Sequence, residues 1–149
     1  MRRFEWLNRL KAVEREFEFV RFAIEQTERL LGEADSDLPT HLSQDDARSA
    51  KRRLAATYLV RIFAEFEAAL RDYWRSVRDK TTQRPVSTLI ESLARYCAVS
   101  EAIYLDANDV RERRNRIVHD GELPTAVDIG LVRGQLCVFL SHLLRGWPA

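Results

Sequence analysis

The sequence contains few of the residues that interrupt or cross-link a chain. Among its 149 residues there are five glycines, four prolines and two cysteines. So little glycine and proline disfavours a sheet with many turns and favours long helices. Cys97 and Cys137 lie far apart, with neither a CxxC pair nor paired Cys/His ligand spacing. We therefore expect both thiols to be reduced, buried and unreactive, and we expect no metal site and no cofactor.

The sequence also lacks a long apolar run. No stretch approaches the roughly 18 residues that a membrane-spanning helix needs. The first residues, Met1 to Glu5, lack the apolar centre of a signal peptide. We therefore expect a cytoplasmic protein that does not associate with a membrane.

Lysine is scarce as well. The chain has three lysines against 21 arginines, yet its formal net charge is only +1. The overall charge therefore predicts no polyanionic partner, and a bias in base composition is sufficient to account for the arginine count. The places where arginines cluster carry more information about function, because a guanidinium is a good bidentate ligand for phosphate.

The composition that is present suits amphipathic helices. Hydrophobic residues make up 46% of the chain and charged residues 32%. A chain of 149 residues is also long enough to bury one core without disulfides or metals. We therefore expect a single domain spanning residues 1–149.

The first predicted helix runs from Arg3 to about Leu31. Apolar and small residues recur there at alternating steps of four and three, at Trp6, Leu10, Val13, Phe17, Val20, Ile24, Thr27 and Leu31. Gly32 stops the helix, and a polar loop follows from Glu33 to Gln44. The stripe predicts packing in a core, and a coiled-coil or dimer seam is the alternative.

The second predicted helix is capped by Ser43 and extends to about Asp79. Its stripe consists of Ala55, Leu59, Ile62, Phe66, Leu70, Tyr73 and Val77. Two helices of similar length predict an antiparallel hairpin. The aromatic side chains of Phe63, Phe66, Tyr73 and Trp74 could stack on bases, but their helical spacing favours the core.

Three shorter helices are predicted after the hairpin. One runs from about Thr88 to Ala98, and the next is capped by Ser100 and runs to about His119, before Gly121. The last follows Pro124 and carries Val127, Leu131, Val138 and Leu143. No alternating strand pattern competes with this assignment. The predicted fold is therefore an all-α, five-helix bundle built on a long antiparallel helix hairpin.

Chemistry-bearing groups concentrate in the segment Arg-Glu-Arg-Arg-Asn-Arg-Ile-Val-His, residues 111–119. Asn115 and His119 are four apart and share a face of a helix, whereas Arg114 and His119 are five apart, about 140° round the axis. A histidine that titrates near neutrality can act as acid or base, and a permanently charged guanidinium can stabilise charge on a phosphorane.

This segment resembles the signature of the HEPN family, which is an arginine, often followed by asparagine, and a histidine after four to six intervening residues. The likeness extends to the position of the motif near the end of a helix in a small helical bundle. Active HEPN members are metal-independent endoribonucleases in which the motifs of two protomers converge in a cleft. The resemblance therefore implies RNA as substrate, a homodimer, and a toxin or defence role with an antitoxin protein as partner.

The resemblance also assigns roles to residues. His119 becomes the general acid or base, Arg114 the phosphate clamp, and Asn115 a polar group that orients His119 or the substrate. Arg113 competes with Arg114, because six residues before His119 is also a permitted spacing. The RNA-binding candidates are Arg111, Arg113 and Arg116. Glu67 is a candidate for a supporting residue that orients an active-site arginine.

The same residues have a simpler interpretation. A histidine in the last turn before a glycine can favour the negative end of the helix dipole, and arginines on a helix often pair with acids such as Asp109 and Glu112. The rival function is a non-catalytic helical binding or scaffold module for RNA, a nucleotide or a protein. That module would bind without turnover, which separates it from the nuclease.

Overall fold

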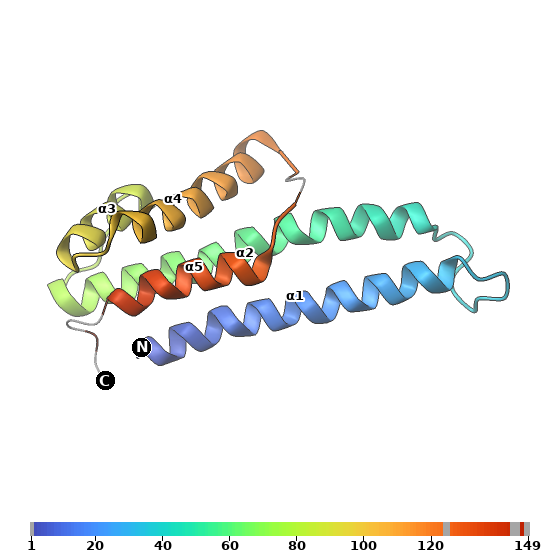
Figure 1. Cartoon of the computed structure of the whole chain (residues 1–149), viewed down its shortest axis with the longest axis horizontal. Coiled ribbons are helices and arrows are strands. Elements are labelled where there is room, and N and C mark those ends of the chain that lie inside the picture. Colours follow the sequence, from blue (N-terminus) through green and yellow to red (C-terminus); the bar gives the residue numbers. More distant parts are fainter. Residues whose placement is uncertain (1, 124–125, 144–146, 148–149) are drawn as a thin grey trace.

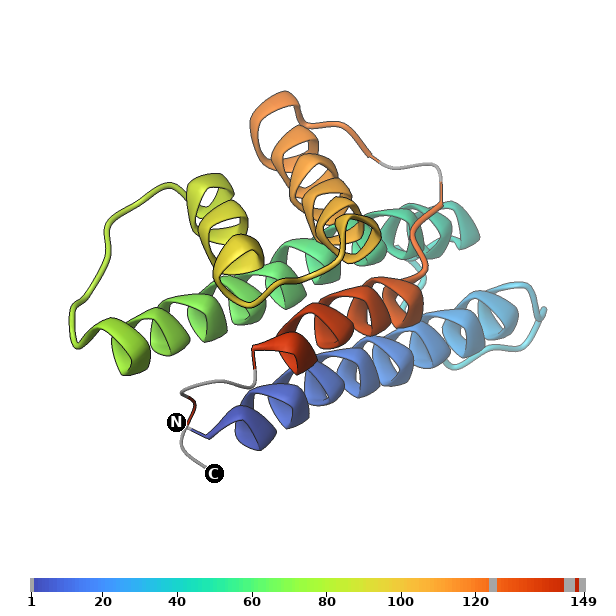
Figure 2. The same ribbon diagram turned by 60° about the vertical axis from the view of Figure 1, so that its left-hand side comes forward.

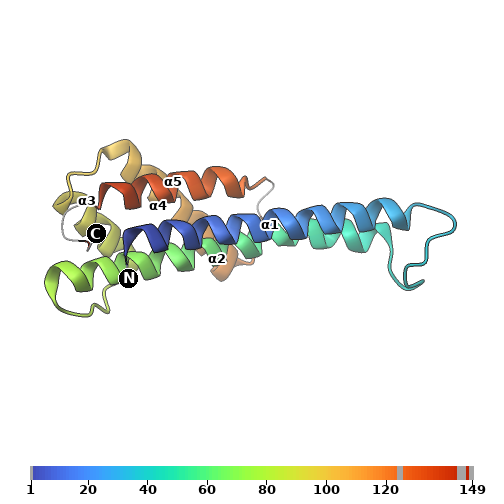
Figure 3. The same cartoon turned by 90° about the horizontal axis from the view of Figure 1, so that it is seen from below.

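A computed structural model describes residues 2–123, 126–143 and 147. These residues form five α-helices and one turn of π-helix: α1 Arg3–Leu31, α2 Gln44–Arg78, α3 Val86–Tyr96, α4 Glu101–Asn115, η1 Arg116–Asp120 and α5 Ile129–His142. The all-α prediction is confirmed. Helices α1 and α2 form the antiparallel hairpin, and α3, α4 and α5 pack along one half of it (Figures 1 and 3). No helix within the described residues has both the length and the apolar character to cross a membrane.

Helix α1 has the predicted bounds, and its stripe packs inside the chain. Trp6, Leu10, Val13 and Phe17 are buried, in contact with the common core. The second half of the stripe, from Val20 to Leu31, is only half-buried. That half belongs to the part of the hairpin that projects beyond the other helices, where α2 alone covers it (Figure 3).

Helix α2 is the centre of the fold because other helices pack on more than one of its sides. The predicted stripe residues Leu59, Ile62, Phe66, Leu70 and Tyr73 are all fully buried. Five further residues, on both sides of this stripe, are also buried: Ala47, Ala56, Tyr58, Phe63 and Ala69. Phe66 packs against Phe139 of α5 with 5.6 Å between ring centroids, which joins the hairpin to the last helix.

The last helix and the two cysteines differ from the sequence prediction. Helix α5 turns Leu131 and Val138 to the solvent and buries Ile129, Val132, Leu136, Phe139 and Leu140 instead. Apolar residues lie on most sides of α5, so its sequence has no distinct polar face from which the buried side could be predicted. Cys97 and Cys137 are free as expected but half-buried rather than buried. Burial still raises the pKa of the Cys137 thiol, which disfavours its reactive thiolate.

The start of α2 is fixed by a reciprocal cap. The hydroxyl of Ser43 accepts a hydrogen bond from the Asp46 N–H at 3.2 Å, and the Asp46 carboxylate accepts one from the Ser43 N–H at 2.9 Å. We predict that Ser43→Ala lowers the free energy of unfolding by about 1 kcal/mol, because a capping side chain satisfies an otherwise free helix N–H. Urea denaturation measures the change, and Ser49→Ala in the helix interior is the control. Equal stability of the two variants would contradict the cap.

The cap also has a pH dependence. Hydrogen bonds from Ser43 lower the pKa of Asp46, because they favour the charged carboxylate. A carboxyl group with a lowered pKa stabilises the fold at neutral pH and loses that effect as the pH falls through the lowered value. The stability difference between the wild type and Ser43→Ala should therefore shrink in acid.

Candidate functional site

The predicted motif lies where α4 ends and η1 begins, the orange end of this helix in Figure 2. Both elements contact α2, whose Arg53 and Thr57 line a cavity together with Ile117. Helix α4 ends at Asn115, and η1 continues the chain without a break from Arg116 to Asp120. The expected helix end near His119 is therefore observed. The wider π-helical turn within it has no counterpart in the sequence prediction.

The π-turn changes which side chains share a face. Its hydrogen bonds span five residues instead of four, as in the bond from the Gly121 N–H to the Arg116 carbonyl. The interval from Arg114 to His119 includes this turn. Both side chains therefore lie closer to a common face than the about 140° separation of a regular α-helix. Single π-turns are frequent at functional sites.

Gly121 ends the turn directly after the motif. Its φ of 67° lies in the left-handed region, which glycine adopts without a steric penalty. The Arg116 carbonyl also accepts a hydrogen bond from the Glu122 N–H at 3.3 Å. The helix is therefore closed two residues after His119, which leaves this side chain exposed at its end.

Three of the four motif arginines are engaged by carboxylates. Arg113 pairs with Asp109 at 2.8 Å, and Arg116 pairs with Glu122 at 3.6 Å. The third, Arg111, binds Glu112 and also donates to Asn108 at 3.0 Å. These three arginines are the ones that the sequence predicts to bind RNA. Such exposed ion pairs are individually weak, about 0–1 kcal/mol, so a phosphate can compete for the guanidinium groups.

Arg114 differs from its neighbours. Among the described residues it has no carboxylate partner, and its guanidinium donates to the Asn115 side-chain oxygen at 3.1 Å. His119 has no hydrogen-bond or ion-pair partner within the same part of the chain. The half-buried Arg114 and the exposed His119 therefore have no acidic partner among the described residues. The other three arginines of the motif are each paired with a carboxylate.

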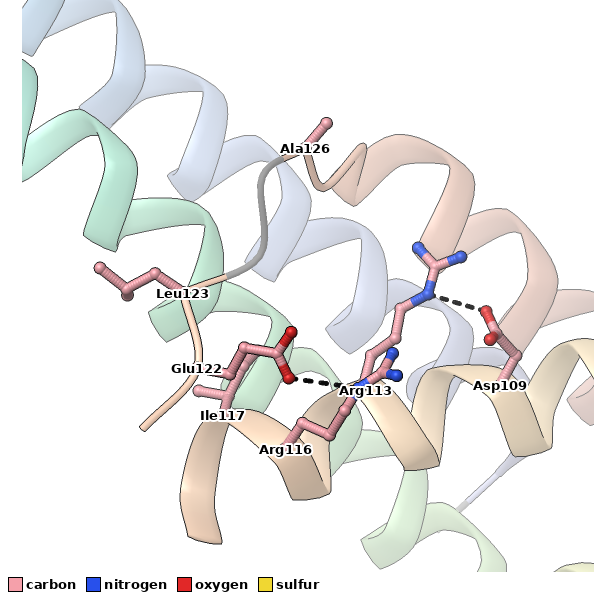
Figure 4. A pocket seen from close by; sticks show the side chains of 7 residues that line it. All are labelled: Asp109, Arg113, Arg116, Ile117, Glu122, Leu123 and Ala126. Atoms are coloured by element: carbon pink, nitrogen blue, oxygen red, sulfur yellow. Dashed lines mark ion pairs between the residues drawn. The ribbon is translucent and has the colours of Figure 1, made fainter. Parts of the chain in front are cut away.

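A cavity of about 340 Å³ lies beside this segment (Figure 4). Its polar lining is formed by the two ion pairs, Asp109 with Arg113 and Glu122 with Arg116, and Ile117 forms part of its apolar lining. A second cavity of about 550 Å³ shares Ile117 and Glu122 and reaches Arg53 and Thr57 of α2. Neither cavity has Arg114, Asn115 or His119 among its lining residues.

Within the described residues, Glu67 binds an arginine of its own helix. Its carboxylate accepts hydrogen bonds from Arg71, one turn along α2, at 2.6 and 3.1 Å. Arg71 in turn donates to the loop after α2. Glu67 therefore supports that loop rather than an arginine of the 111–119 segment.

The described part of the chain contains no group of three or more His, Cys, Asp or Glu side chains placed to hold a metal ion. Its chemistry-bearing centre is instead a basic helix end with one histidine. Comparison of the chain with protein-family models, with curated proteins and with solved structures finds no match in any of the three. An inference about function therefore depends on the motif and its geometry.

Proposed function

We propose that this protein is a metal-independent endoribonuclease of the HEPN type, with His119 as general acid or base and Arg114 as the phosphate ligand. The observation that carries the proposal is the contrast within the motif. Within the described residues, Arg114 is held by Asn115 and has no carboxylate partner, and the exposed His119 has no hydrogen-bond or ion-pair partner. An arginine that is not paired with a carboxylate is available to bind the substrate phosphate, and a histidine without a partner is available to transfer a proton.

The reaction begins with the 2′-hydroxyl of the RNA. A base removes its proton, the 2′-oxygen attacks the adjacent phosphorus, and the bond to the 5′-oxygen breaks as that oxygen receives a proton. The products are a 2′,3′-cyclic phosphate and a 5′-hydroxyl. Negative charge builds on the phosphorane oxygens between these steps, and the guanidinium of Arg114 donates to them.

The two proton transfers favour a homodimer. One imidazole cannot be deprotonated as the base and protonated as the acid at the same moment, whereas His119 of two protomers supplies both states. Apolar side chains beside the motif suit burial against a second copy: Val118 is 46% exposed and Leu123 is 49% exposed. Analytical ultracentrifugation of the wild type tests the dimer, which we expect at micromolar concentration.

The two competing arginines can be separated by substitution. We predict that Arg114→Gln reduces the single-turnover cleavage rate by roughly 10²-fold or more, the cost of removing one preorganised donor to a developing oxyanion. Arg113→Gln should reduce the rate far less, because Arg113 is already paired with Asp109. A larger loss in Arg113→Gln would transfer the catalytic role to Arg113.

The rival function, a non-catalytic binding module, gives a different result in the same assay. It predicts that the wild-type protein binds RNA and does not cleave it. Salt should release the RNA, because phosphate contacts weaken steeply with ionic strength. That result would replace the nuclease proposal. A toxin or defence role with an antitoxin partner follows only from the nuclease, and growth arrest on expression of the wild type but not of a His119 variant would support it.

A further inference from the structure

A separate cavity lies at the C-terminal end of α2, where the chain turns into α3. It has a volume of about 620 Å³, and its lining residues are Trp74, Arg78, Lys80, Thr81, Thr82, Arg84 and Ser92. The lining supplies three cations and three hydroxyl groups but no acid. Asp79, between two of the cations in sequence, is not among the lining residues.

The three cations of this cavity are not neutralised. Arg78, Lys80 and Arg84 have no carboxylate partner within the described residues, and their side chains make no hydrogen bond there. Arginines elsewhere on α2, such as Arg61 and Arg71, do bind acids. Like charges that share a cavity repel one another, so an anion bound between them is stabilised by all three.

Aromatic rings hold the two guanidinium groups. Arg78 lies over Trp74 at 5.5 Å and over Tyr96 at 5.3 Å from the ring centroids, and Arg84 lies over Trp74 at 4.8 Å. Stacking engages the face of a guanidinium and leaves the N–H groups in its plane free to donate. The rings therefore fix the position of both cations without consuming their hydrogen bonds.

The loop that carries Arg84 is held by hydrogen bonds from a side chain of α2. Arg71 donates to the Thr82 carbonyl at 3.0 Å and to the Arg84 carbonyl at 3.2 Å, and Glu67 holds Arg71. The Thr82 hydroxyl accepts a hydrogen bond from the Arg84 N–H at 3.1 Å. The loop is thus ordered before any ligand arrives, which reduces the entropy cost of binding.

We propose that this cavity binds a ligand with linked phosphate groups, such as the diphosphate or triphosphate part of a small molecule. Three cations from two consecutive segments can contact the oxygens of more than one phosphate group. Both guanidinium groups lie over the Trp74 ring, so this ring is less available to stack on a base. We therefore expect the ligand to be recognised by its charge. Along α2, Arg78 is 21 residues from Thr57 of the cavity beside the motif, roughly 30 Å. The site is therefore distinct from the proposed nuclease centre.

Isothermal titration calorimetry of the full chain with sodium tripolyphosphate tests this proposal. We expect one site per chain, tighter for tripolyphosphate than for inorganic phosphate and weakened by salt. The variants Arg84→Gln and Lys80→Gln should each weaken binding by roughly ten-fold, the loss expected for charge-assisted contacts. The exposed Lys80 side chain makes no hydrogen bond or ion pair within the described residues, so we expect its substitution to leave the fold intact.

Arg75→Gln is the matched control, because it removes the same charge from the last turn of α2 without touching the lining of the cavity. Equal weakening in Arg75→Gln, or no binding of tripolyphosphate to the wild type, would overturn the site. Binding of a single-stranded RNA through Lys80 and Arg84 without binding of tripolyphosphate would overturn the ligand class. His119→Ala should bind tripolyphosphate like the wild type, so failure of the nuclease proposal leaves this test unaffected.

Discussion

His119→Ala should lower the rate of RNA cleavage by roughly 10²- to 10⁴-fold, the usual contribution of a general acid or base. His119 is exposed near the end of η1 and has no hydrogen-bond or ion-pair partner in the described part of the chain, so its substitution breaks no such bond. The variant should therefore keep its thermal stability and its oligomeric state while it loses activity. Single-turnover cleavage of a labelled RNA measures the effect.

His142→Ala is the matched control, because His142 is also exposed but lies at the end of α5, outside the motif. It should cleave RNA like the wild type. Equal activity of His119→Ala and the wild type would exclude His119 from the chemistry. Equal loss in both histidine variants would show a general effect of substitution rather than a catalytic role.

Phe66→Ala should lower the free energy of unfolding by about 3–5 kcal/mol, the range for removing a fully buried phenylalanine. Phe66 is 0% exposed and packs against Phe63 of α2 and Phe139 of α5, with centroids 5.7 and 5.6 Å away. The cavity left behind would lie where the hairpin and the last helix meet, so little relaxation is expected. Urea denaturation followed by circular dichroism gives the value.

Phe19→Ala provides the comparison for the same chemical change at the surface. Phe19 is 74% exposed on α1, and its loss should change stability by no more than about 0.5 kcal/mol. If the two phenylalanine variants were equally stable, the buried position of Phe66 at the centre of the bundle would be contradicted.

The hairpin could be predicted from the sequence because its signals agree with one another. The stripe on α1 has a regular helical period, Gly32 stops it, and Ser43 caps α2. Helix α5 could not be oriented in the same way. It is apolar on most sides, so only its packing against α1, α2 and α4 decides that Phe139 points inward and Val138 outward.

The residues of the candidate site could be predicted from the sequence, but their geometry could not. Spacing alone places Asn115 and His119 on one face and leaves Arg114 far round the helix. The π-turn brings Arg114 closer to that face, and the spacing of the motif gives no sign of this turn. The choice between Arg113 and Arg114 depends on ion pairs, which form only in the folded chain.

The phosphate site shows a second limit of sequence patterns. Trp74 directly follows the fully buried Tyr73, and the two belong to one aromatic stretch for which the helical period predicts the core. Trp74, one residue further along the helix, is only half-buried at the edge of the core, and Arg78 and Arg84 lie over its ring. Arg84 comes from the loop after α2, and no periodic pattern relates a loop residue to a helix face.

The most direct test of the central claim is the chemistry of the product ends. The wild-type protein is incubated in EDTA with a single-stranded RNA labelled at its 5′ end, and the fragments are analysed by mass spectrometry. The account predicts cleavage without a divalent metal, with a 2′,3′-cyclic phosphate on the 5′ fragment and a free 5′-hydroxyl on the other. Fragments with a 5′-phosphate, or RNA that stays intact at stoichiometric protein, would contradict it.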